Sequence, residues 1–136
     1  MKNALRTVGG VLAGLVLISM IAEGIEFVLV TALHGSVTMD PDTYFAIRNR
    51  PGVLAFKLVY NSVAALAGGF VCAWIAGRME MLHGLLLAAV QTAGFIYGMT
   101  ASPFAHTTPL WMWIVLTVLT AAAVFFGAHI RVRKKR

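Results

Sequence analysis

The stretch Ser19-Met20-Ile21-Ala22-Glu23-Gly24-Ile25-Glu26-Phe27-Val28 contains two carboxylates within a run that is otherwise apolar enough to cross a bilayer. Removing a carboxylate from water is costly, so each of these side chains needs a proton or a polar partner. The rest of the chain must therefore bring polar groups to the depth of Glu23 and Glu26.

The composition is typical of a membrane protein. Of the 136 residues, 60% are hydrophobic and 12% are charged, which is about half the charged share of a soluble domain. The net charge of +6 is concentrated at the end of the chain, where a basic tail follows an apolar run. Such a tail is typical of a cytoplasmic anchor attracted to anionic lipid head groups, and it argues against nucleic acid as a partner. The tail comprises Arg131, Arg133, Lys134, Lys135 and Arg136.

Four apolar runs are long enough to span a membrane, at about 8–33, 53–76, 82–99 and 110–130. They predict an all-α integral membrane bundle of four transmembrane helices that forms one domain over residues 1–136. A cleaved signal peptide is the competing interpretation of the first run. Because Met20 stands where a cleavage site after Ala22 needs a small residue, we expect an uncleaved first helix.

The segment 34–52 is the one extended loop outside the membrane. It contains Asp40-Pro41-Asp42-Thr43, a typical helix start with an acidic cap and an early proline. Tyr44 to Ile47 then predicts a short interfacial helix of one or two turns, which ends at the segment 48–52.

The distribution of basic residues predicts the orientation. By the positive-inside rule, the side with more Lys and Arg is cytoplasmic. Both termini are therefore expected in the cytoplasm and the 34–52 loop outside, in a bacterial inner membrane. One side holds eight basic residues (Lys2, Arg6, Arg78 and the five of the tail) and the other three (Arg48, Arg50, Lys57).

A buried polar layer is predicted from helix geometry. At about 1.5 Å per residue, Lys57, Asn61 and Gln91 fall in the same outer-to-middle band of the membrane as the two glutamates. The simplest arrangement pairs Glu26 with Lys57, and Glu23 with Asn61 or Gln91. This network either fixes which helix faces point inward, or Glu23 is a titrating site that exchanges a proton for a substrate.

Small residues form two rows along the second spanning run. In lipid, such rows allow helix backbones to approach closely, so they predict a packing face. The first row is Ala65, Gly69, Ala73 and Gly77; the second is Ala64, Gly68, Cys72 and Ala76.

The last spanning run is expected to be anchored at both membrane interfaces. Trp111 and Trp113 at its start match an aromatic belt, and Arg131 and Arg133 at its end match a head-group anchor.

No motif for catalysis, metal binding or phosphate binding is present, so we expect neither an enzyme nor a resident metal or cofactor. Four histidines leave bis-histidine haem ligation as a minor alternative, although all lie at helix ends or in loops. His34 and His106 are expected on the outer side, and His83 and His129 on the inner side.

The run Gly68-Gly69-Phe70-Val71-Cys72-Ala73-Trp74-Ile75-Ala76-Gly77-Arg78 resembles the second helix of a family of small, uncharacterised four-helix bacterial inner-membrane proteins. The acidic first helix and Pro109-Leu110-Trp111-Met112-Trp113 agree with this resemblance. The resemblance implies the architecture and no particular activity.

The leading functional interpretation is a non-catalytic protein that self-associates, giving a homo-oligomer, or serves as an accessory subunit of a larger membrane complex. The alternative is a proton-coupled small-molecule transporter using Glu23, and the third is a haem-binding redox subunit. The chain resembles the small multidrug transporters in its helix count and first-helix glutamate. It differs from them in its strong charge bias and long outer loop, so their mechanism is not carried over.

Overall fold

The structure, a computed structural model, describes residues 2–103 and 105–135, and this part of the chain is all helical. Four helices are long and apolar enough to cross a membrane, which agrees with the predicted fold class. A short helix of eight residues and a single 3₁₀ turn complete the fold. The elements are α1 (Lys2–His34), α2 (Pro41–Arg48), α3 (Pro51–Ala76), α4 (Glu80–Thr100), η1 (Ala105–Thr107) and α5 (Leu110–Lys135).

The long helices extend beyond the apolar runs that predicted them. Helix α1 begins at Lys2, not near residue 8, and α5 continues to Lys135, not only to residue 130. An apolar run marks the part of a helix that suits lipid, but the helix itself continues until a breaker ends it. The segments 3–7 and 131–135 contain no proline or glycine.

The turn between α3 and α4 lies at residues 77–79, so α4 begins at Glu80, two residues before the start of the apolar run predicted at 82–99. Gly77 ends α3 in a left-handed conformation (φ 63°), and its N–H donates to the carbonyl of Ala73 at 3.1 Å. Gly77 therefore caps the helix instead of continuing the packing row in which it was predicted. Met79 is also left-handed (φ 46°), which costs a residue other than glycine about 1–2 kcal/mol.

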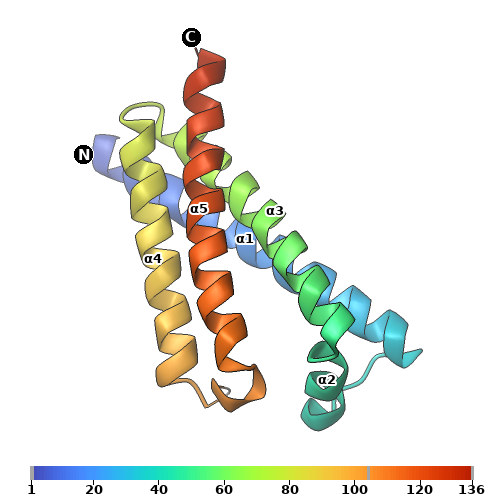
Figure 1. The fold of residues 1–136 in the computed structure, drawn as a ribbon. Helices are drawn as coiled ribbons and strands as arrows, with labels where there is room; N and C mark the ends of the chain where they lie inside the picture. Colours follow the sequence, from blue (N-terminus) through green and yellow to red (C-terminus); the bar gives the residue numbers. More distant parts are fainter. Residues whose placement is uncertain (1, 104, 136) are drawn as a thin grey trace.

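Helix α3 is the centre of the bundle, with α1 and α5 packed against it (Figure 1). Helix α4 packs mainly against α5. The chain ends and the α3–α4 turn lie at one end of the bundle, here called the termini side. Helix α2 and the α4–α5 connection lie at the other end, here called the loop side (Figure 1).

The α3–α5 contact is made backbone to backbone. A Cβ atom added at Gly69 would lie 2.1 Å from the carbonyl oxygen of Val124, and one added at Gly127 would lie 2.0 Å from that of Leu66. Ala65 and Ala73, which share a row with Gly69, are fully buried. The first small-residue row is therefore used within the chain, against α5.

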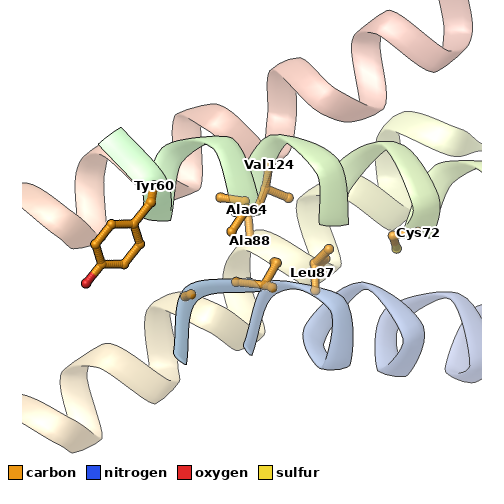
Figure 2. Packing of buried hydrophobic residues seen from close by; sticks show 9 residues of the cluster. Tyr60, Ala64, Cys72, Leu87, Ala88 and Val124 are labelled. Atoms are coloured by element: carbon orange, nitrogen blue, oxygen red, sulfur yellow. The ribbon is translucent and has the colours of Figure 1, made fainter. Parts of the chain in front are cut away.

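The second row packs against α1 in the same way. A Cβ atom at Gly68 would lie 2.8 Å from the carbonyl oxygen of Gly14, and one at Gly10 would lie 2.9 Å from that of Cys72. Figure 2 shows Ala64 and Cys72 of α3 in the core with Leu87 and Ala88 of α4. Both rows of α3 are therefore occupied by the chain's own helices.

We expect Gly69→Ala to lower the free energy of unfolding by about 1–3 kcal/mol or more, because the added methyl group meets backbone atoms that cannot rotate away. The matched control is Gly24→Ala in α1, where an added Cβ has nothing within 4 Å. It should be neutral or slightly stabilising through helix propensity. Equilibrium unfolding in mild detergent measures both, and equal stability of the two variants would contradict the close α3–α5 contact.

Candidate functional site

The Glu26 carboxylate is the centre of a buried ion cluster that joins three helices. Glu26 lies on α1, and its side chain is 5% exposed. One oxygen accepts hydrogen bonds from Lys57 Nζ and from the hydroxyl of Tyr60, the latter at 2.8 Å. The other oxygen lies 3.0 Å from Arg48 Nε, although the N–H does not point at it. A single carboxylate thus links α1 to both α2 and α3.

Local sequence explains how these partners reach Glu26. Lys57 and Tyr60 are three residues apart and share one face of α3. The Glu26–Lys57 contact is the pairing that helix depth predicted, and the structure contains it. Arg48 and Tyr60 were missed. Their only sequence signals are the position of Tyr60 one helical turn beyond Lys57 and that of Arg48 in the last turn of the interfacial helix.

Helix α2 holds Arg48 over the cluster, and an N-cap fixes where α2 begins. The carboxylate of Asp40 accepts hydrogen bonds from the backbone N–H of Thr43 at 3.0 Å and from its hydroxyl. These bonds, the Thr43 hydroxyl first, hold the pKa of Asp40 below its ordinary value. Partial burial and the negative charge of Glu26 raise the pKa of Tyr44 on the same helix. The predicted interfacial helix is therefore present and covers the ion cluster.

Glu23 lies one turn away and has no such partners. Its side chain is exposed and makes no hydrogen bond or ion pair with any residue in the described part of the chain. It lines a groove of about 410 Å³ between α1 and α4. The other residues of this groove, the Glu23 groove, are Leu15, Ile18, Ser19 and Ala22 of α1, Asn61 of α3, and Val90, Gln91, Gly94 and Phe95 of α4.

The polar residues predicted to pair with Glu23 line this groove without bonding to it. Asn61 instead donates from Nδ2 to the carbonyl oxygen of Lys57 at 2.9 Å. The side-chain oxygen of Gln91 is buried and has no hydrogen-bond partner in the described residues. The structure therefore gathers Glu23, Asn61 and Gln91 in one groove, where two hydrogen-bond acceptors remain unused.

A second groove, of about 470 Å³, meets Glu23 from the other side, between α1 and α2. Phe27, Met39 and Tyr44 contribute to it. Glu23 thus stands between two open grooves, whereas Glu26 is enclosed by protein.

The predicted anchors of α5 divide into outward-facing and inward-facing residues. Trp111 is 53% exposed and Arg133 is also exposed, as expected of interface anchors. Trp113 instead packs on Phe95, and its indole N–H donates to the carbonyl of Ala105 at 3.4 Å. Arg131 is partly buried, with no hydrogen-bond partner for Nε in the described part of the chain.

The four histidines do not form one cluster, because they are divided between the two ends of the bundle. His83, on the termini side, lies 2.9 Å from Thr7 Oγ1, and His34, on the loop side, bonds to Ser36. His106 is in η1 and His129 is near the end of α5. Within the described residues, no group of three or more His, Cys, Asp or Glu side chains is arranged to hold a metal ion.

No family model, curated protein or solved structure significantly matches this chain. The function is accordingly argued from the geometry of the two carboxylates.

We expect Glu26→Gln to lower the free energy of unfolding by about 3–5 kcal/mol, because the buried Lys57 and the partly buried Arg48 would lose their counter-charge. Lys57→Met should cost less, since Glu26 keeps Arg48 and Tyr60 as partners. Adding Lys57→Met to Glu26→Gln should recover part of the loss. A double-mutant cycle in mild detergent measures the coupling, and additive losses would argue against the cluster.

The pH dependence of α2 follows from the Asp40 cap. Because the folded-state pKa of Asp40 is lowered, the cap contributes fully above the ordinary aspartate pKa and is lost as pH falls through the lowered value. The protection factors of the α2 amides, which correct for the pH dependence of intrinsic exchange, should therefore fall on acidification. Asp40→Ala should give low protection factors at every pH, while Asp42→Asn should keep the wild-type profile. An unchanged profile in Asp40→Ala would exclude the cap as the cause.

Proposed function

We propose that this chain is a non-catalytic multi-pass membrane protein that acts as an accessory subunit, binding a transmembrane helix of a partner through the Glu23 groove. The observation that carries the proposal is an unpartnered carboxylate in a groove between two apolar helices. The accompanying location is a bacterial inner membrane with both termini in the cytoplasm, supported by the excess of Lys and Arg at the termini side.

The polar groups of the Glu23 groove are suited to an occupant that donates hydrogen bonds. The Glu23 carboxylate and the Gln91 side-chain oxygen are both acceptors without partners in the described chain. An unsatisfied polar group at membrane depth costs several kcal/mol. An occupant that brings a lysine, arginine or other N–H or O–H donor removes that cost. The proposed partner helix therefore carries a basic or amide side chain facing the groove.

The shape of the groove suits a helix. Its α1 residues fall at positions 15, 18, 19, 22 and 23, and its α4 residues at positions 90, 91, 94 and 95. Both sets repeat every three to four residues, which is the pattern of a helix-packing face. The α1 stripe extends for about 12 Å along the helix axis. Leu15, Ile18 and Val90 supply apolar walls on either side of the polar groups.

A different protein is a better candidate for the partner than a second copy of this chain. The small-residue rows that suggested self-association are occupied by α1 and α5. The chain also offers few basic residues at the depth of Glu23, because Lys57 and Arg48 are engaged by Glu26. A homo-oligomer would therefore have to satisfy Glu23 without them.

The alternative is proton-coupled transport of a small amphiphilic cation. The observation that favours it is the openness of Glu23 to two grooves, which would admit a small molecule as well as a helix. In this alternative Glu23 binds either a proton or the cation, and apolar walls hold the rest of the substrate.

Site-specific photo-crosslinking separates these possibilities. A photoreactive residue at Val90, in the Glu23 groove, should capture one protein partner in intact cells, whereas one at Val118, exposed on α5 outside the grooves, should not. Glu23→Gln should reduce the Val90 adduct about tenfold or more, since a charge-assisted hydrogen bond is lost. Asp42→Asn, which removes an acid from α2, should leave the adduct unchanged.

Two other results would contradict the accessory-subunit role and support a different function. Adducts at Val90 made only with a second copy of this chain would support self-association. Absence of any protein adduct, together with loss of cation efflux in a well-folded Glu23→Gln protein, would favour the transporter.

A further inference from the structure

A separate cavity with polar and apolar walls lies on the termini side, between the start of α1 and the α3–α4 turn. Its volume is about 140 Å³. The cavity is distant in sequence from Glu23 and Glu26, and its polar lining comes from three elements. These residues are Asn3, Arg6 and Thr7 of α1, Arg78 of the turn, and His83 of α4.

The charge of this cavity is positive and uncompensated. Arg6 and Arg78 both line it, and neither forms an ion pair within residues 2–103 and 105–135. No acidic side chain contributes to the lining. Glu80, which follows the turn, is paired with Lys135, whose Nζ lies 3.2 Å from its carboxylate. Two guanidinium groups around a small cavity attract an anion, and their planar forks match phosphate oxygens.

The walls of the cavity are fixed by a chain of hydrogen bonds. His83 is buried, with Nδ1 3.0 Å from the carbonyl oxygen of Met79 and Nε2 2.9 Å from Thr7 Oγ1. The carbonyl oxygen of Asn3, 3.0 Å from Thr7 Oγ1, is an alternative acceptor for the same hydroxyl proton. These bonds tie the first turns of α1 to the first turn of α4. The N-terminus of α4 also faces this region, and its partial positive charge favours an anion.

We propose that this cavity binds the phosphate group of an anionic phospholipid. The cavity is at the ends of spanning helices, where hydrocarbon gives way to head groups. On α1, Leu5 and Val8 flank Arg6 and are 68% and 57% exposed, and Leu12, 55% exposed, continues this stripe along the helix toward the middle of the bilayer. These side chains offer a surface for acyl chains beside the phosphate. The bound lipid braces α1 against the α3–α4 turn.

This site differs from the general attraction of the basic tail to anionic lipids. The tail residues Arg133 and Lys134 are exposed and attract head groups without a shaped cavity. Arg6 and Arg78 instead line one shallow cavity from two different elements. The cavity therefore predicts a saturable, one-to-one site, which diffuse attraction does not give.

Lipid titration of the purified protein in neutral detergent tests the proposal. Native mass spectrometry should detect one tightly bound phosphatidylglycerol and much weaker binding of phosphatidylcholine, whose head group carries a compensating cation. Arg6→Gln/Arg78→Gln should weaken phosphatidylglycerol binding about tenfold or more. Arg133→Gln/Lys134→Gln removes the same charge from the same side of the bundle and should keep the one-to-one binding close to wild type.

Three results would overturn the proposal. Equal weakening in the two double variants would reduce the effect to diffuse electrostatics. Displacement of the lipid by millimolar inorganic phosphate would identify a site for free phosphate. Unchanged binding in the Arg6→Gln/Arg78→Gln protein would exclude the cavity. If that protein does not fold, Arg78→Lys provides the test, because it keeps the charge, loses the bidentate fork and should still weaken binding.

Discussion

The neutralisation of Glu26 is the constraint on which the arrangement of α1, α2 and α3 depends. A carboxylate without access to water must find cations and hydrogen-bond donors, and only a specific docking of neighbouring elements supplies them. Lys57 and Tyr60 set the alignment of α3 along α1, because a shift of one residue would turn them away. Arg48 reaches the same carboxylate only when α2 folds back over the membrane end of the pair. One buried charge thus organises both a helix pair and a loop.

The sequence alone predicts the features that depend only on the length of an apolar run or on depth along a helix axis. Apolar run length predicted the four spanning helices, and depth along two antiparallel helices predicted the contact between Glu26 and Lys57. Neither run length nor depth determines how the loop at 35–50 folds back onto the bundle. The contact of Arg48 with Glu26 could therefore not be predicted from the sequence. Rotation about the helix axis was also undetermined. Glu23 and Glu26 are 60° apart on α1 at about 100° per residue, and only the packed neighbours decide which of them is enclosed.

The small-residue rows likewise predict that a helix packs closely against α3 without identifying that helix. Their spacing correctly predicted close backbone contact, but it did not say which helix would make that contact. In the structure, Gly69 meets α5 and Gly68 meets α1, so α3 is packed on both faces by its own chain. The surfaces left for other molecules are consequently those without small-residue rows. Among them, the Glu23 groove is distinguished by its unused polar groups.

The two carboxylates of α1 can be assigned different roles on electrostatic grounds. The Glu26 cluster contains one carboxylate and two cations, so it leaves an excess of positive charge. That excess acts on its surroundings strongly because membrane and protein screen charge poorly. A second carboxylate placed one turn away on the same helix is stabilised by it without needing a contact of its own. Glu23 can therefore remain in an open groove without unfolding the bundle. Of the two carboxylates, only Glu23 therefore remains open to groups outside the chain.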